Sequence, residues 1–368
     1  MSFRVAVAGL LALSAIPALA DETLPEGVYR GSLGKQEVVL EIGPVESETG
    51  DPYDGRYFYR RYGVVIPLKI ARQTDGSLRL QEVQEGEPTG AEWRLAVAGD
   101  GAQGEFCRCD VRKPKTSADK RIAISLTLLP GSGREGREKA YRAALLDFPL
   151  TPGSETRVDS QIAYVMETDR RFGAALPRLT HFPDAAIMQK VDDALARALD
   201  DLRLEAAECL FNAEHLYPTF WQQEYRVALF NRDVLSIGGW VSHQCEKGEA
   251  HPTDEVRSLV YDLRTGDRFD FDAFFRSPDQ VSGELIALYR TYHKNSGFPE
   301  ECEEFVNDSD FDPDVRERFY FDRNGLALDL RDGVAPVYEG CATDVIIPYR
   351  EIRKLVRGDR LYPWLISP

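Results

Sequence analysis

Residues 56–70, RYFYRRYGVVIPLKI, decide the fold class of the first half of the chain. Aromatic residues dominate the first part of this stretch and Val and Ile the second, and both kinds are enriched in β-strands. Tyr57, Phe58, Tyr59 and Tyr62 form an aromatic cluster. On a strand, such a cluster is more often cross-strand packing than the wall of a ligand groove, and both interpretations stay open at this point.

Further short β-rich runs lie on both sides of this stretch, between residues 27 and 129. Asp75-Gly76 and Asp100-Gly101 are hairpin signals between apolar runs. Strands at short spacing, separated by turns, predict an all-β antiparallel meander over residues 21–130. It would be either half of a sandwich or a small barrel.

Residues 131–157 are rich in Gly, Arg, Glu and Pro and predict a linker. Pro130-Gly131-Ser132-Gly133 and Thr151-Pro152-Gly153-Ser154 are turn clusters at its two ends. We therefore expect a domain boundary here, with a second domain over residues 158–368.

The second domain mixes helical and strand patterns. After Pro183 and Asp184, apolar residues recur at a helical spacing and predict a helix with one buried stripe. Residues 225–230 and 234–237 predict a hairpin, and Asn324-Gly325 is the strongest short hairpin signal in the chain. Together these patterns predict an α+β domain with an antiparallel sheet. The apolar stripe consists of Ile187, Val191, Leu195, Leu199 and Leu202.

The N-terminal residues have the layout of a secretory signal peptide. Arg4 precedes an apolar run over residues 5–16, and Ala18-Leu19-Ala20 fits a signal peptidase site. We expect cleavage after Ala20 and a mature protein that is periplasmic or secreted; the alternative is a buried N-terminal helix. The run is shorter than the roughly 20 residues of a membrane span, and charged residues interrupt every later apolar run, so no span is expected after cleavage.

The chain is strongly acidic. It has 61 Asp and Glu against 45 Lys and Arg, a formal net charge of −16, and removal of Arg4 with the signal peptide would make it −17. Such a chain repels nucleic acids and anionic lipid surfaces. It would attract cationic partners.

Export together with six cysteines predicts disulfide bonds. We favour the pairs Cys209–Cys245, Cys302–Cys341 and Cys107–Cys109, although spacing alone does not fix the pairing. Cys107 and Cys109 have a second interpretation as a redox or metal-binding element.

Three segments of the second half, residues 236–252, 259–266 and 319–349, resemble a known domain. It is the C-terminal extracytoplasmic domain of RsiV-type lysozyme-sensing anti-sigma factors, which also accompanies some secreted peptidoglycan deacetylases. That family carries Gly-Gly-Ala-His-Pro, then a strand ending in Asp-Leu-x-Thr-Gly, then a strand ending in Ile-Pro-Tyr. In this chain Glu249 stands where the family has its second Gly. The resemblance covers about residues 158–356.

The resemblance implies an α+β module that binds a partner in the cell envelope. In the anti-sigma factors the domain recognises lysozyme, so a cationic, lysozyme-like protein is the partner that it implies. The candidate binding residues within the matching segments are Glu249, His251, Tyr261 and Tyr349.

His243, Cys245, Glu249 and His251 are the densest group of potential metal ligands. A zinc site would require Cys245 as a free thiolate, and a surface loop with a disulfide is the favoured interpretation.

Carboxylates also alternate along residues 308–314, as at the start of a calcium loop. However, Pro313 occupies the place of the mid-loop Gly and Phe319 that of the bidentate Glu, so a solvated acidic loop is favoured. The carboxylates are Asp308, Asp310, Asp312 and Asp314.

No sequence motif predicts a catalytic residue, a metal or a cofactor. The chain has no Gly-x-Ser-x-Gly elbow, no His-Glu-x-x-His pair, no phosphate loop and no dinucleotide fingerprint. We therefore expect an envelope binding or sensing module that binds or inhibits a cationic protein such as lysozyme, or binds a cell-wall fragment. The alternatives are a cell-wall hydrolase or modifying enzyme with an unrecognised site, and a structural envelope interaction protein.

Overall fold

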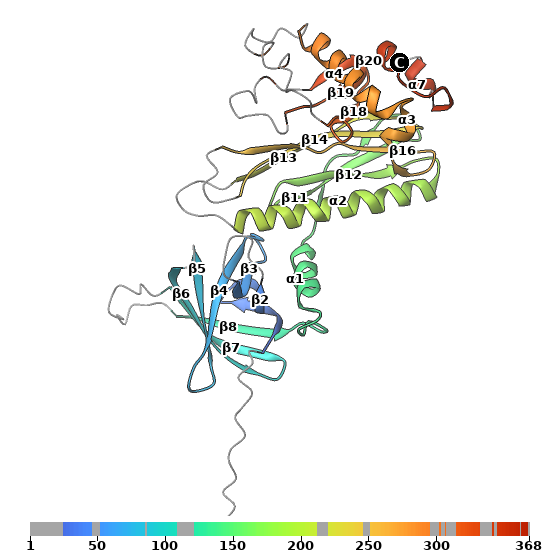
Figure 1. Ribbon diagram of the computed structural model, residues 1–368. Helices are drawn as coiled ribbons and strands as arrows, with labels where there is room; N and C mark the ends of the chain where they lie inside the picture. Colours follow the sequence, from blue (N-terminus) through green and yellow to red (C-terminus); the bar gives the residue numbers. More distant parts are fainter. Residues whose placement is uncertain are drawn as a thin grey trace, which may run out of the picture.

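The computed structural model describes residues 25–45, 52–84, 87–108, 121–211, 220–245, 251–294, 302, 306, 314–331, 341, 344–360 and 362–366. Within these residues, a closed β-barrel is followed by a mixed part of helices and small antiparallel sheets (Figure 1). This combination of a β-rich part and an α+β part agrees with the sequence prediction.

The barrel decides between the two β architectures that the sequence allows. Each strand pairs antiparallel with the next, and β1 pairs with β8 to close the barrel. The strands are β1 (Gly27–Leu33), β2 (Gln36–Val45), β3 (Tyr53–Tyr59), β4 (Val65–Arg72), β5 (Leu78–Gln84), β6 (Glu87–Ala98), β7 (Gly101–Arg108) and β8 (Arg121–Leu128).

Neighbouring residues of β3 enter different cores, because successive side chains of a strand point to opposite faces. Tyr57 points into the barrel, where its ring centroid lies 4.7 Å from that of Trp93. Phe58 points outward, and its ring centroid lies 5.3 Å from that of Tyr141. The predicted aromatic cluster is thus mainly packing, although Tyr62 beyond the strand is 52% exposed.

The hairpin expected at Asp100-Gly101 lies one residue earlier. Ala98 pairs with Gly101, so the two-residue turn is Gly99-Asp100. Gly99 has a φ of 55°, a backbone conformation that glycine adopts without a steric penalty. The turn at Asp75-Gly76 lies between β4 and β5 as expected, with Gly76 at a φ of 83°.

The segment expected to be a linker, residues 131–157, contains regular structure. It forms helix α1 (Arg137–Leu146) and the two short strands β9 (Thr151–Pro152) and β10 (Thr156–Arg157). In Figure 1, α1 stands beside the barrel and below the long helix of the mixed part.

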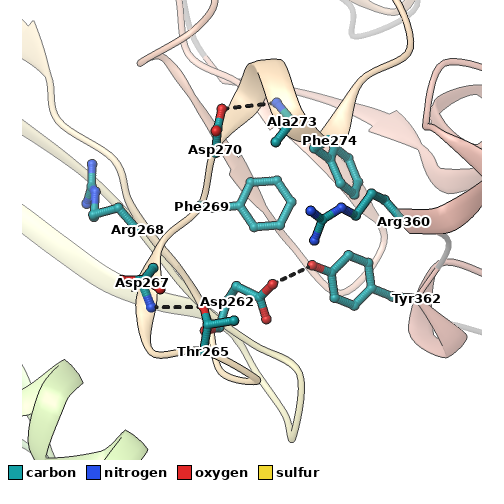
Figure 2. A pocket seen from close by; sticks show the side chains of 10 residues that line it. All are labelled: Asp262, Thr265, Asp267, Arg268, Phe269, Asp270, Ala273, Phe274, Arg360 and Tyr362. Atoms are coloured by element: carbon teal, nitrogen blue, oxygen red, sulfur yellow. Dashed lines mark hydrogen bonds between the residues drawn. The ribbon is translucent and has the colours of Figure 1, made fainter.

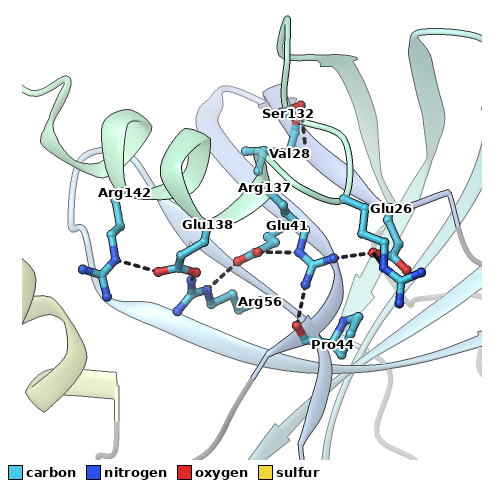
Figure 3. A network of polar contacts seen from close by, with 10 residues as sticks. Glu26, Val28, Glu41, Pro44, Arg56, Ser132, Arg137, Glu138 and Arg142 are labelled. Atoms are coloured by element: carbon cyan, nitrogen blue, oxygen red, sulfur yellow. Dashed lines mark hydrogen bonds and ion pairs between the residues drawn. The ribbon is translucent and has the colours of Figure 1, made fainter.

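A buried carboxylate ties α1 to the barrel (Figure 3). Glu41 of β2 is 1% exposed and accepts hydrogen bonds from Arg56 Nε at 2.6 Å and Arg137 Nε at 2.8 Å. The guanidinium of Arg56 also lies 4.1 Å from the ring centroid of Tyr141 on α1. Since each buried charge is paired, the network fixes the helix on the barrel.

The described residues of the mixed part form three antiparallel sheets. The first joins β9, β10, β11 (Ala163–Asp169) and β12 (Ala174–His181). The second joins β13 (Phe220–Phe230), β14 (Val234–Gln244), β15 (Thr253–Val256), β16 (Leu259–Asp262) and β17 (Asp267–Arg268). The third joins β18 (Phe319–Phe321), β19 (Gly325–Leu328) and β20 (Val345–Pro348).

The long helix α2 (Ala185–Phe211) is the helix that the apolar stripe predicts. Val191, Leu195 and Leu199 are at most 3% exposed. Asp184 caps the start, because its carboxylate accepts the backbone N–H groups of Ala186 and Ile187 at 2.9 and 3.1 Å. Figure 1 shows α2 running along β11 and β12 on the side that faces the barrel.

Short helices and the third sheet enclose a second core that is rich in Phe and Tyr. Phe269 is central to it, with ring centroids 4.6 Å from Phe274 and 5.1 Å from Phe321. The helices are α3 (Phe271–Phe274), α4 (Pro278–Lys294), α6 (Tyr349–Ile352), the 3-10 turn η2 (Gly358–Arg360) and α7 (Pro363–Ile366).

Two predicted disulfides are confirmed. Cys209–Cys245 joins the end of α2 to the end of β14, and Cys302–Cys341 forms the second bond. Cys107 is also disulfide-bonded, whereas Cys109 lies outside the described residues.

No helix within the described residues is long and apolar enough to span a membrane. The predicted signal peptide, residues 1–20, lies outside them.

Candidate functional site

The structure places Tyr261 and Tyr349, two of the four sequence-predicted binding residues, in different cores. Tyr261 is 2% exposed and belongs to the core under α2, whereas Tyr349 is 4% exposed and belongs to the Phe-rich core. The hydroxyl of Tyr349 donates a hydrogen bond to the backbone oxygen of Asp322. His251 is exposed, and Glu249 lies outside the described residues.

The possible ligands around His243 are engaged in other contacts. Cys245 is bonded to Cys209, so its sulfur is not a thiolate. His243 Nε2 lies 3.1 Å from Glu255 Oε1, and its ring stacks on Trp221. No group of three or more His, Cys, Asp or Glu side chains that could hold a metal occurs within the part of the chain that the structure describes.

The acidic loop lies mostly outside the described residues, which include only its last carboxylate. Asp314 accepts the backbone N–H of Arg316 at 3.0 Å. The residues outside are Asp308, Asp310 and Asp312.

A cavity of about 220 Å³ lies where the β16–β17 turn, α3 and the last described segment of the chain meet (Figure 2). Its walls combine aromatic rings with charged groups and a hydroxyl. They are formed by Asp262, Thr265, Asp267, Arg268, Phe269, Asp270, Ala273, Phe274, Arg360 and Tyr362.

One wall of the cavity is the carboxylate of Asp262, and both of its oxygens accept hydrogen bonds. Asp262 Oδ1 accepts Arg264 Nε at 3.0 Å, and Oδ2 accepts Arg264 Nη2 at 2.7 Å and the Tyr362 hydroxyl at 3.0 Å. Burial opposes ionisation of Asp262, but these hydrogen bonds outweigh it and hold its pKa below the usual range. Burial and the neighbouring Asp262 charge raise the pKa of Tyr362, which therefore stays protonated as the donor.

The position of Asp262 follows from the local sequence Asp-Leu-Arg-Thr-Gly, residues 262–266. The backbone oxygen of Asp262 accepts the N–H groups of Thr265 at 3.2 Å and Gly266 at 2.7 Å, which closes a turn. Gly266 has a φ of 73°, and a Cβ there would lie 3.0 Å from Lys190 Cδ of α2, so a side chain there would be strained. Part of the motif that resembles the anti-sigma factor domain therefore has a purely structural explanation.

The same turn occurs at residues 169–173, Asp-Arg-Arg-Phe-Gly. The backbone oxygen of Asp169 accepts the N–H groups of Phe172 and Gly173, and Gly173 also has a φ of 73°. The carboxylate of Asp169 accepts Arg171 Nε at 3.0 Å and, in addition, Arg203 Nε of α2 at 2.8 Å. The sequence signal for this repeat is the Asp-x-Arg-x-Gly spacing, which is not one of the motifs noted above.

Arg360 differs from the other charged groups of the cavity. Asp267 pairs with Lys190 at 2.7 Å, and Asp270 caps α3 by accepting Ala273 N at 3.0 Å. Arg268 donates to the backbone oxygen of Ser258 and points away from the cavity in Figure 2. Arg360 forms no ion pair with any described residue, and its guanidinium is turned toward the ring of Phe269.

The arrangement is suited to holding a ligand. Its carboxylates are occupied by cations or backbone N–H groups, its aromatic rings are fixed, and one guanidinium faces the empty space. The sequence pointed to the Asp262 turn but not to Arg360 or Tyr362. These two residues lie about a hundred positions further along the chain, and no local pattern connects them to the turn.

No protein-family model and no curated protein matches the sequence. Two solved structures of DUF3298 family proteins are similar, one from Bacteroides fragilis at 14% identity and one from Pseudomonas aeruginosa at 16%. Each comparison covers 60% of this chain and 98% of the other, with a TM-score of 0.38. The relation to lysozyme-sensing anti-sigma factors and to peptidoglycan deacetylases stays a prediction.

Proposed function

We propose that this chain is an extracytoplasmic binding module for a cationic protein, with lysozyme as the first partner to test. The observation that carries the proposal is the charge of −16, combined with where the positive charges lie. Arg171 and Arg203 are 1% and 4% exposed and Arg56 and Arg137 are 11% and 12% exposed, each paired with a buried carboxylate. Because these arginines are buried, they do not offset the charge of the exposed carboxylates, and the net negative charge lies mainly on the surface.

The exposed side of α2 is the surface that we assign to the partner. Asp193, Asp201 and Glu208 are exposed there, and their spacing places them on one side of the helix. The exposed Arg197 lies on the same side, and Glu208 lies 3.8 Å from Arg142 of α1, so the ridge is acidic through its surplus of carboxylates. An acidic ridge of this kind accelerates encounter with a basic protein and weakens as salt screens it.

Location supports the same proposal. The signal-peptide pattern, with cleavage predicted after Ala20, supports a mature chain in the periplasm or outside the cell. The disulfides Cys209–Cys245 and Cys302–Cys341 are typical of oxidising compartments. The resemblance of residues 236–252, 259–266 and 319–349 to the lysozyme-sensing domain is the reason for choosing lysozyme.

The test is a titration of the oxidised protein, without residues 1–20, against a basic c-type lysozyme at low and at physiological salt, with lysis measured in parallel. We expect binding that weakens steeply with salt and is accompanied by loss of lysis. Binding without loss of lysis would support a sensor instead of an inhibitor, and no binding at either salt would refute the choice of partner.

Two triple variants with the same net charge separate the α2 ridge from charge in general. Replacing the three ridge carboxylates by amides should weaken binding by about tenfold or more. Replacing three exposed carboxylates elsewhere should have a much smaller effect. The control positions are Glu87, Glu135 and Glu317.

A further inference from the structure

We infer that the cavity at the β16–β17 turn binds an acidic sugar, with the carboxylate on Arg360 and the sugar ring against Phe269. This site lies apart from the α2 ridge and does not depend on the proposed function. The inference rests on a guanidinium that has no ion pair among the described residues, on the aromatic wall and on the oxygen atoms around the same space.

Arg360 supplies the charge selectivity. It forms no ion pair with the described residues, and a guanidinium is a planar set of donors that matches the two oxygens of a carboxylate. The nearest carboxylate wall does not oppose an anion strongly, because Asp262 is neutralised by Arg264. Asp267 is likewise paired with Lys190. Asp270 remains to balance Arg360, so the cavity is close to neutral before a ligand enters.

The half-buried ring of Phe269 supplies the apolar surface. Phe274 and Tyr362 are 2% and 3% exposed and support it, with the Phe269 and Tyr362 ring centroids 6.3 Å apart at an interplanar angle of 36°. Oxygen atoms of Thr265 and Asp270 line the same space and can accept hydrogen bonds from sugar hydroxyl groups. An apolar ring face, several hydroxyls and one carboxylate are the three features of an acidic sugar that these groups match.

The site is rigid and small. Tyr362 donates to Asp262, and the guanidinium of Arg264 lies 4.1 Å from the Tyr362 ring centroid. Little ordering is therefore needed on binding, which favours affinity. The cavity volume of about 220 Å³ is below the roughly 300–1,000 Å³ of most ligand pockets, so we expect one sugar unit to enter.

The experiment compares two probes that differ by one lactyl ether group, which carries the carboxylate. N-acetylmuramic acid and N-acetylglucosamine share the ring and the acetamido group, and only the former carries a carboxylate. We expect the oxidised protein to bind the acid about tenfold or more tightly than the neutral sugar in calorimetric or NMR titrations. Absence of binding by the acid, or equal binding of both probes, would overturn the inference.

Arg360→Gln should reduce affinity for the acid by about tenfold and abolish the preference between the probes. Arg350→Gln is the matched control, because Arg350 is 68% exposed on α6 and lies outside the cavity. Equal losses in both variants would mean that general charge, not the cavity, holds the acid. Lysozyme binding should be unchanged in Arg360→Gln, so the two proposals fail independently.

Discussion

At the scale of single residues, the same turn motif occurs twice in this protein, in two different surroundings. Asp169 and Asp262 each begin an Asp-x-Arg-x-Gly turn, and each binds the Arg two positions later. Their surroundings differ, because the side chain of Asp169 is fully buried and that of Arg171 is 1% exposed. Arg264 in the second turn is 42% exposed.

This difference predicts unequal effects of the same substitution. Asp169→Asn leaves the buried Arg171 without a counter-charge and leaves Arg203 with only the more exposed Asp200, and we expect a loss of about 3–5 kcal/mol in the free energy of unfolding. Asp262→Asn removes a partner from an exposed guanidinium, and we expect a loss of about 1 kcal/mol. Urea denaturation of the two variants measures both losses.

Asparagine keeps a side-chain oxygen that can accept the backbone N–H of the turn, so both variants retain the turn itself. Equal losses would therefore show that the turn, and not the burial of charge, determines the effect. The pKa of Asp169 supports the expected order: burial opposes its ionisation, but the bonds from Arg171 and Arg203 hold the pKa below the usual value.

At the scale of elements, α2 is fixed to β12 through a half-buried carboxylate. Asp192 Oδ1 accepts the backbone N–H of Leu179 at 2.8 Å. Burial, together with the charges of Glu167 and Asp193, raises the pKa of Asp192 to about 6, although the Leu179 N–H and Arg178 oppose the shift. The charged form is therefore less stable in the folded protein than in the unfolded chain.

The sign of the pH dependence follows from this shift. The raised pKa stabilises the folded protein fully below the ordinary Asp value of about 4, and this stabilisation is lost as pH rises through about 6. The free energy of unfolding of Asp192→Asn, relative to that of the wild type, should therefore increase by about 1–2 kcal/mol from pH 4.5 to pH 7.5, after allowance for partial solvent exposure. Unfolding in urea at the two pH values measures the gain, and Asp201→Asn, at an exposed position of the same helix, is the control. A constant difference between variant and wild type across the pH range would contradict the role given to Asp192.

The elements that could be predicted from the sequence are those with a local pattern. The stripe at Val191, Leu195 and Leu199 predicted α2, and alternating apolar runs predicted the β-rich first half. Helix α1 was missed because distant groups hold it: Glu41 at one end, and Arg171 and Arg203 at the other. Only part of the candidate cavity could be predicted from the sequence, because Asp262 lies in a recognisable motif whereas Arg360 lies far from it along the chain.

At the scale of the whole molecule, the barrel and the mixed part share one core. Phe58 and Val65 of the barrel cluster with Phe172 and Leu199 of the mixed part. Gly63, in the turn after β3, has a φ of 72°, and a Cβ there would lie 2.4 Å from the Phe172 ring. Helix α1 connects the two parts as well, because Arg171 and Arg203 donate to the backbone oxygens of Leu145 and Leu146.

A shared core predicts that the two parts unfold together. Trp93 lies in the barrel, whereas the other three tryptophans of the chain lie in the mixed part, so two sets of Trp→Phe variants report on each part separately. Phe58→Ala removes a fully buried ring between the two parts, and we expect it to lower the free energy of unfolding by about 3–5 kcal/mol. Because the core is shared, the loss should appear equally in the Trp93 signal and in the signal of the other three. A shift confined to Trp93 would show that the barrel unfolds independently, and the joint core would then not couple the two parts.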